Sequence, residues 1–399
     1  MRPLKILHTD FHTGWGGQAS RVLMLSEELA RRGHGVTIAA PPGELSRKAR
    51  GAGRFASGIG VEDRFAFRAP SHAVSFLRDV WRMRALLQRG RFDIVDVHGS
   101  QDTWVTALAR LATGLPRCLV MTRHNTKRVR TGPANRLLYG RVIDHLILVD
   151  ESIKLQYAAL LARGTLKASR ISVVPSCFRA DLFHGGVDGG RVRRELSLPE
   201  GAVTVGVAGR LVEDKGHVHL MRAAASLRSS LPGLTLVFAG AGPHEDRLRE
   251  EAGRLGMRDA VRFLGFRSDI AEVEAAFDVA VLPSVGCDAS SASIKEAMAL
   301  GVPVIASDIG GARGIIQDGV TGTIVRPGRA DDLEAALTSL LRDRERAAAM
   351  ARRAQAEVVR RFSLARLADE TLQAYETAMA RCGERGRPSA EAAGARVTA

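Results

Sequence analysis

Short apolar runs and longer amphipathic stretches alternate along the chain. The apolar runs at residues 4–8, 36–40 and 93–98 have the length and composition of buried strands. The stretch from Ala19 to Arg32 has the period of a helix, and Gly33 follows it as a stop signal. Strand, helix and strand in this order predict a parallel sheet that is covered by helices.

The same pattern begins again in the second half of the chain. A cluster of glycines at residues 185–190 is typical of a linker. Beyond it, strands are predicted at residues 203–207, 234–238, 261–266 and 276–284, and a helix at 291–300. The sequence therefore predicts two doubly wound α/β domains, at residues 1–183 and 201–361, with a linker at residues 184–200. A last amphipathic helix is predicted at residues 362–381, and a disordered tail at 382–399.

Two segments of the first half fit this pattern less clearly. Residues 41–68 are rich in Gly and Arg and predict a loop with some short structure. Between His72 and Arg89, the residues Phe76, Leu77 and Trp81 recur at helical spacing between arginines. A basic amphipathic helix can lie on a membrane surface, but packing against its own sheet is more common, and we expect core packing here.

The basic residues are concentrated in the first half of the chain. The chain has 399 residues, enough for two domains, and a net charge of +15. Residues 1–185 contain 29 Lys and Arg and 14 Asp and Glu, which gives this half the whole net charge of +15. Residues 186–399 therefore have a net charge of zero. A basic surface attracts anions such as nucleic acid, acidic lipid headgroups or a phosphorylated acceptor.

The apolar content of 45% and the charged content of 25% are typical of a soluble globular protein. The four cysteines are widely spaced, no apolar run reaches 18 residues, and the start of the chain lacks the core of a signal peptide. We therefore expect a cytoplasmic protein, which the basic half could hold on the inner face of the membrane.

Candidate site residues of the first half follow predicted strands. His98 and His124 stand where two strands end, the edge at which doubly wound sheets bind ligands. Isolated histidines are more often structural, so both roles stay open. Lys127, Arg128 and Arg130 come directly afterwards and could bind an anionic acceptor or a membrane, although a solvated charge run is the ordinary alternative.

Two carboxylates, Asp288 and Glu296, stand eight positions apart around a predicted helix start at about Ser291. Were the segment helical throughout, it would rise roughly 12 Å, about the length of a sugar diphosphate. Free N–H groups at a helix N-terminus favour phosphates, and carboxylates accept hydrogen bonds from sugar hydroxyls. The alternative is that Asp288 caps the helix and Glu296 is solvated.

The surrounding sequence resembles the signature of glycosyltransferase family 4, a group of retaining nucleotide-sugar transferases. Asp288 is followed by Glu-Ala-Met-Ala-Leu-Gly-Val-Pro-Val-Ile at residues 296–305 and by Gly310-Gly311. A second hallmark, Gly-Arg-Leu-x-x-x-Lys-Gly, occupies residues 209–216. The sequence departs from the family pattern at two places. The first acid is Asp288 followed by Ala-Ser-Ser, where the family usually has Glu followed by Gly-Phe-Gly. After Pro175 the chain has Ser-Cys-Phe, where the family usually has Asn-Gly-Val.

This resemblance implies the GT-B fold, with two Rossmann-like domains that face a cleft and a C-terminal helix that crosses back to the first domain. The donor would bind the second domain, and the acceptor the basic first domain. Arg210, Lys215 and the helix start at Ser290, Ser291, Ala292 and Ser293 would stabilise the departing diphosphate. Glu296 would hold the ribose, Asp288 the sugar hydroxyls, and Phe266 and Arg267 the base. Across the cleft, Gly16 and Gly17 would approach the donor closely, and His98 and His124 would lie near the donor sugar and the acceptor.

We thus expect transfer of a sugar, with retention, from a nucleotide-sugar donor to a glycan or lipid-linked acceptor, in the synthesis of lipopolysaccharide, capsule or another surface glycan. No Asp-x-Asp motif occurs, so we expect no metal requirement and no cofactor. One alternative is a GT-B nucleotide-sugar epimerase or hydrolase. Another is a nucleic-acid-binding protein, which the low aromatic content of 5% and the lack of a reading motif argue against.

Overall fold

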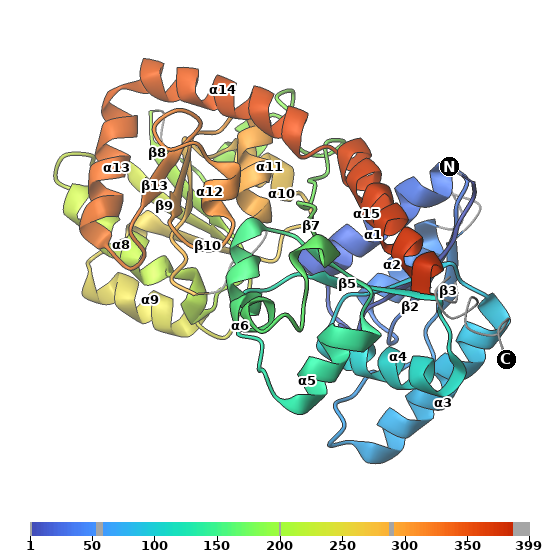
Figure 1. Cartoon of the computed structure of the whole chain (residues 1–399). Coiled ribbons are helices and arrows are strands. Elements are labelled where there is room, and N and C mark those ends of the chain that lie inside the picture. Colours follow the sequence, from blue (N-terminus) through green and yellow to red (C-terminus); the bar gives the residue numbers. More distant parts are fainter. Residues whose placement is uncertain (1, 53–58, 199–200, 287–290, 386–399) are drawn as a thin grey trace, which may run out of the picture.

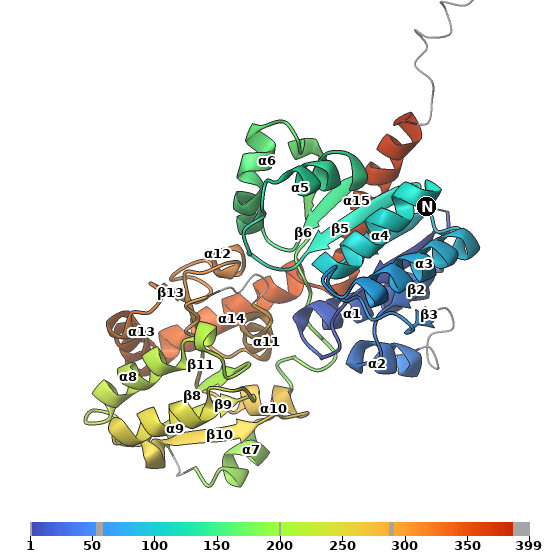
Figure 2. The same ribbon diagram turned by 90° about the horizontal axis from the view of Figure 1, so that it is seen from below.

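A computed structural model shows two parallel sheets, each with helices on both faces (Figure 1). It describes residues 2–52, 59–198, 201–286 and 291–385. This arrangement confirms the predicted GT-B fold, and Figure 2 shows the two sheets side by side.

The first sheet has seven parallel strands in the order β3-β2-β1-β4-β5-β6-β7. Their bounds are β1 Lys5–Thr9, β2 Gly35–Ala39, β3 Ile59–Glu62, β4 Ile94–Val97, β5 Cys118–Arg123, β6 His145–Leu148 and β7 Ile171–Val173. The connecting helices are α1 Gly17–Arg31, α2 Glu44–Ala52, α3 Ala73–Gly90, α4 Ser100–Thr113, α5 Pro133–Leu137 and α6 Ala158–Ala162.

The central strands β1, β4, β5 and β6 are buried on both faces, which is why they are mostly apolar. Leu7 and Val95 belong to the core beneath α3 and α4. Ile6 and Ile94, one residue before them, face α1 and belong to a separate core. Alternate residues along a strand therefore belong to different cores.

The second sheet has six parallel strands in the order β10-β9-β8-β11-β12-β13. Their bounds are β8 Val203–Ala208, β9 Leu234–Ala239, β10 Val261–Gly265, β11 Val279–Leu282, β12 Val304–Ser307 and β13 Thr323–Val325. The helices are α7 Gly190–Glu195, α8 His217–Leu227, α9 Glu245–Arg254, α10 Ile270–Ala275, α11 Ala292–Leu300, α12 Ala312–Ile315, α13 Ala330–Arg342 and α14 Arg344–Arg361.

The chain returns to the first sheet through its last helix, α15 Leu364–Arg385. Leu367, Leu372 and Tyr375 of this helix are buried in the same core as Ile6 and Ile94. In Figure 1 the helix, in red, leaves the second sheet after α14 and lies beside α1. The first sheet is thus completed by residues from the far end of the sequence.

Two predicted irregular segments contain regular structure. Residues 41–68, expected as a loop with some short structure, hold α2 and the edge strand β3. Among the side chains of α2 whose burial the structure describes, Leu45 and Ala49 are the buried apolar ones, so the apolar pattern of this helix is weak. The segment expected as a linker, residues 184–200, contains α7. Its Val192 is fully buried in a core of the second sheet.

Helix α3 has two apolar stripes on opposite sides. Phe76 packs into the core, as expected, together with Met83 and Leu87. Leu77 and Trp81, which we also expected in the core, are instead 55% and 64% exposed, and Val74 beside them is 83% exposed. Spacing at 74, 77 and 81 is itself helical, so periodicity alone could not tell which stripe faces the sheet. Across the described part of the chain, no helix is both long enough and apolar enough to cross a membrane.

Candidate functional site

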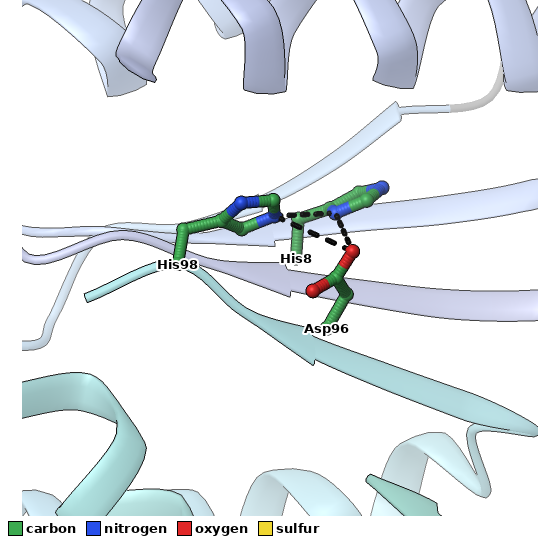
Figure 3. A group of neighbouring side chains, drawn as sticks. All are labelled: His8, Asp96 and His98. Atoms are coloured by element: carbon green, nitrogen blue, oxygen red, sulfur yellow. Dashed lines mark hydrogen bonds and ion pairs between the residues drawn. The ribbon is translucent and has the colours of Figure 1, made fainter. Parts of the chain in front are cut away.

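Three histidines form a hydrogen-bonded row at the carboxyl edge of the first sheet. His8 Nδ1 lies 3.0 Å from His98 Nε2, and His98 Nδ1 lies 3.0 Å from His124 Nε2. Figure 3 shows the first two rings with Asp96, whose Oδ2 lies 4.0 Å from His8 Nδ1 and 3.8 Å from His98 Nε2. The structure therefore places the two predicted histidines in direct contact and adds a third.

The register of the sheet explains this row. His8 on β1 is the parallel partner of Asp96 on β4. His98 is two residues beyond Asp96, and His124 is two residues beyond Thr122 on β5, so all of them project from one face. This is the face that α1 and α15 cover, because Ile6 and Ile94 point the same way into that core.

Burial keeps the histidines of the row neutral. It lowers the pKa of His8 and of His98 to about 3, and it lowers the pKa of His124 well below its ordinary value. Burial also raises the pKa of Asp96. Thr122 Oγ1 donates to both of its oxygens at 2.9 Å, and the hydroxyl of Tyr375 on α15 donates to Oδ2 at 2.7 Å.

Two further carboxylates beside the row have no counterpart in the sequence analysis. Asp10 accepts hydrogen bonds from His12 Nδ1 at 2.8 Å and from Gln18 Nε2 at 3.0 Å. Asp102 accepts a 2.6 Å hydrogen bond from Thr9, and burial raises the pKa of Asp102 to about 7. Both anchor the loops that follow β1 and β4.

The remaining candidates of the first domain are exposed. Gly16 is the N-cap residue of α1, and a side chain there would meet open space, which leaves room for a ligand beside the free N–H groups of the helix. Gly17 begins the helix. The side chains of Lys127 and Arg128 are exposed after β5. Arg130 is exposed as well.

In the second domain, two glycine loops pack backbone against backbone beyond β8 and β9. Gly240 has φ +150°, and a Cβ there would overlap the carbonyl oxygen of Gly209. The side chain of Arg210 is exposed, and that of Lys215 is half-buried. Glycine is required at Gly240 because any larger residue would push apart the loop that carries these two cations.

The same loop is joined to the segment that follows β11. The carbonyl oxygen of Asp214 accepts hydrogen bonds from the N–H groups of Val285 and Gly286, at 2.8 and 3.1 Å. Lys215 is therefore held next to the segment that leads to α11. Asp288 and Ser290, two of the predicted donor-binding residues, lie outside the described residues.

Helix α11 begins one residue beyond Ser291, which is buried and has a left-handed backbone with φ +38°. Because the backbone is left-handed at Ser291, the helix does not include this residue. Ala292 and Ser293 are half-buried in the first turn. Glu296 lies in the body of the helix, as predicted, and burial raises the pKa of its carboxyl to about 7.

The residues expected to hold the base differ in exposure. Phe266, directly after β10, is 79% exposed. The guanidinium of Arg267 is already engaged by the carboxylates of Glu195 and Asp269. Phe266 is thus accessible to a ligand, whereas Arg267 would have to exchange ion-pair partners to bind one.

The atypical segment after Pro175 links the two domains. Ser176 is buried, and its carbonyl oxygen accepts a 2.7 Å hydrogen bond from Lys295 Nζ on α11. Its hydroxyl accepts a hydrogen bond at 3.3 Å from Arg21 on α1. Ser176 therefore contacts a buried cation from each domain.

Comparisons with known proteins agree over both halves of the chain. Residues 15–193 match the family described as glycosyltransferase family 4, and residues 190–357 match that described as glycosyl transferases group 1. The D-inositol 3-phosphate glycosyltransferase of Nocardia farcinica is 31% identical, covering 91% of this chain and 85% of the relative. The phosphatidyl-myo-inositol mannosyltransferase of Mycobacterium leprae is 29% identical, covering 91% and 93%.

Solved structures show the same fold. A glycosyltransferase from Rickettsia africae superposes with a TM-score of 0.82 at 19% identity, covering 95% of this chain and 99% of the other. HepE of Anabaena in complex with UDP has a TM-score of 0.78 at 22% identity, covering 94% and 100%.

Proposed function

Because this chain belongs to the family of group 1 glycosyltransferases, we propose that it transfers a sugar from a nucleotide-sugar donor to a phosphate-bearing acceptor. The observation that carries the proposal is the backbone junction between Asp214 and Val285-Gly286, which joins the loop of Arg210 and Lys215 to the segment before α11. The donor diphosphate would bind at this junction.

The junction suits a departing diphosphate. Arg210 and Lys215 supply two positive charges, and the first turn of α11 supplies free N–H groups and the positive end of a helix dipole. Charge that develops on the leaving phosphate is thus met by groups already in place, which is the main way such sites accelerate reactions. We propose that these cations serve in place of a metal ion, and that Glu296 binds the ribose.

Relatives and neighbours suggest the substrates. HepE of Anabaena was crystallised with UDP and with UDP-glucose, which favours a uridine nucleotide. The relatives are named after D-inositol 3-phosphate and phosphatidyl-myo-inositol, and the exposed residues Lys127, Arg128 and Arg130 match such anionic acceptors. We therefore favour an inositol phosphate headgroup over lipopolysaccharide or capsule as the acceptor, with transfer under retention as in the resembled family.

We further propose that the first domain works on an anionic membrane surface. Val74, Leu77 and Trp81 form an exposed apolar stripe on α3, and arginines flank the stripe in the sequence. A double substitution Leu77→Ser, Trp81→Ser should abolish cosedimentation with vesicles that contain phosphatidylserine. The control is Leu155→Ser, which changes an exposed leucine elsewhere in this domain and should leave the cosedimentation unchanged.

The donor site is tested first, by thermal shift with UDP, GDP, ADP and CMP, each with and without EDTA. A ligand that binds the folded state raises its melting temperature by mass action. Loss of one charge-assisted hydrogen bond costs about 1.5–3 kcal/mol, so Arg210→Ala or Lys215→Ala should weaken binding about 10- to 100-fold. Arg344→Ala, an exposed arginine on α14, is the control. Absence of a shift with every nucleotide would refute the donor site, and a shift that EDTA removes would refute metal independence.

The acceptor is then tested with the donor so identified. Transfer to inositol phosphate or to phosphatidylinositol vesicles, with the anomeric configuration of the product read by NMR, would support the proposal. Release of free sugar at the same rate with and without acceptor would identify a hydrolase instead.

A further inference from the structure

The row of histidines has one end in the protein interior and one at the edge of the sheet. His8 Nε2 is buried and has no hydrogen-bond partner among the described residues. His124, at the other end, is half-buried, and its Nε2 is taken by His98. Only Nδ1 of His124 therefore remains for a ligand.

We propose that His8 is a positioning residue that fixes His98 and His124 as Nδ1–H tautomers, so that His124 presents an N–H donor to the substrates. This assignment rests on the proposed function for its role in catalysis, but its structural part can be tested without any substrate.

The direction of the hydrogen bonds follows from the buried end. Each neutral imidazole carries one proton, and each hydrogen bond between two rings uses one. All hydrogen bonds of the row therefore run the same way, either outward to the edge of the sheet or inward to the protein interior. In the inward direction, His8 would carry its proton on Nε2, where no acceptor lies among the described residues. In the outward direction the same nitrogen would be an unpaired acceptor. Either state costs about 1–3 kcal/mol, but buried N–H groups without an acceptor are rarer in proteins than under-satisfied acceptors, which favours the outward direction. In the outward direction, His8 Nδ1–H donates to His98 Nε2, His98 Nδ1–H donates to His124 Nε2, and His124 carries its proton on Nδ1.

Asp96 stabilises the row electrostatically in either direction of donation. Its Oδ2 lies within 4.0 Å of the two nitrogens that share the first proton of the row, and therefore favours a proton between them. Tyr375 and Thr122 hold the carboxylate in this place.

The three atoms His8 Nδ1, His98 Nε2 and Asp96 Oδ2 also lie close enough together to hold a metal ion. A nearby positive charge argues against a metal ion at this place. Arg21 is fully buried on α1, and its positive charge acts on both histidines and on Asp96. A dication would have to share this interior with the guanidinium, whereas a neutral row beside one carboxylate and one guanidinium is electrically balanced.

The tautomer decides what His124 can do. With Nε2 accepting from His98, its free nitrogen is a donor and cannot remove a proton. It can hydrogen-bond a sugar hydroxyl or a phosphate oxygen of a substrate. His124 would thus stabilise negative charge and would not act as a general base.

The test uses the full-length protein labelled with ¹⁵N-histidine, without substrate. Long-range ¹H–¹⁵N correlation distinguishes Nδ1–H from Nε2–H imidazoles, and the 11 histidines are assigned by substitution. We expect Nδ1–H tautomers for His8, His98 and His124 in the wild type. His8→Phe should leave His98 and His124 in mixed tautomers, whereas His8→Asn, whose amide N–H can replace Nδ1–H, should restore them. His145→Gln, which changes a buried histidine of β6 outside the row, is the control.

Activity is a second readout. His8→Phe should lower kcat by about tenfold or more, as expected for a misplaced proton, and His8→Asn should recover most of it. Nε2–H tautomers in the wild type, unchanged tautomers in His8→Phe, or one equivalent of bound zinc that is lost in His8→Phe would overturn the assignment. Correct tautomers in a protein that binds no nucleotide would instead count against the proposed function alone.

Discussion

Tyr375 and Tyr157 form a matched pair for measuring how much the hydrogen bond of Tyr375 contributes to stability. Both side chains are fully buried in the first domain. The hydroxyl of Tyr375 donates to Asp96 Oδ2 at 2.7 Å, whereas that of Tyr157 has no well-formed hydrogen bond within the described part of the chain and lies near the phenol of Tyr139, an uncharged group. Replacing each tyrosine by phenylalanine removes one oxygen atom and keeps the ring.

The expected costs differ because only one hydroxyl has a charged partner. A hydrogen bond to a charged group contributes about 1.5–3 kcal/mol, and Asp96 keeps its bonds from Thr122. We expect Tyr375→Phe to destabilise the first domain by about 2 kcal/mol, or roughly 4–8 °C for a unit of this size. Tyr157→Phe should be neutral or slightly stabilising, since a buried hydroxyl without a well-formed hydrogen bond is replaced by an apolar edge.

Tryptophan fluorescence reports on the unfolding of the first domain and can therefore measure this difference in stability. The three tryptophans, Trp15, Trp81 and Trp104, all lie in the first domain. Their signal in urea therefore follows the unfolding of that domain, although Tyr375 belongs to the last helix of the chain. Equal midpoints for the two variants would refute the reasoning, because they would show that the bond to Asp96 adds nothing net to stability.

Three more predictions concern the same framework. Because burial lowers the pKa of His8 and of His98 to about 3, each histidine should cost up to about 1.4 kcal/mol of stability per pH unit as the pH falls from about 6.5 towards 3, whereas Asp102, whose pKa is raised to about 7, offsets part of this loss; His8→Phe should therefore lose less stability than the wild type between pH 7 and pH 5, and equal losses in the urea midpoint would contradict this. Gly240→Ala should abolish the nucleotide-induced thermal shift while the tryptophan transition stays in place, because its Cβ overlaps the carbonyl oxygen of Gly209; a retained shift would show that the loop adapts. Leu372→Ala should cost about 2–5 kcal/mol in the tryptophan transition, since this side chain is buried between α15 and the first sheet, and a smaller loss would mean that the core collapses around it.

The fold was predictable because strands of doubly wound sheets are apolar on both faces. Such runs are visible without knowledge of their partners, and the strands that were predicted begin and end close to the observed positions, whereas the edge strand β3 was missed. Helix α3 shows the limit of this reasoning. Its two apolar stripes have the same period, and only the position of the sheet decides that Leu87 is buried while Trp81 is exposed.

The candidate site was predictable only where residues follow a strand or belong to a motif. His98 and His124 met the first condition, and Arg210 and Lys215 met the second. The bond between Asp96 and Tyr375 joins residues 279 positions apart, and no local pattern could have paired them. His8 did carry a signal, because the apolar alternation Leu4, Ile6 turns polar at the third position of the same face. A polar residue at the carboxyl end of a buried face therefore merits a search for partners on the neighbouring strands.

The return of α15 to the first sheet sets the order in which the protein can mature during synthesis. Residues 1–183 leave the ribosome first, but one face of their sheet is covered only in part, by α1, until Leu367 to Ala378 have been made. At about 5–20 residues per second, this wait lasts roughly 10–40 s. The second sheet has its own cores and can fold during that interval. The half of the enzyme that is translated first is thus the half that is finished last, and the buried histidines are sealed from water only when the final helix arrives.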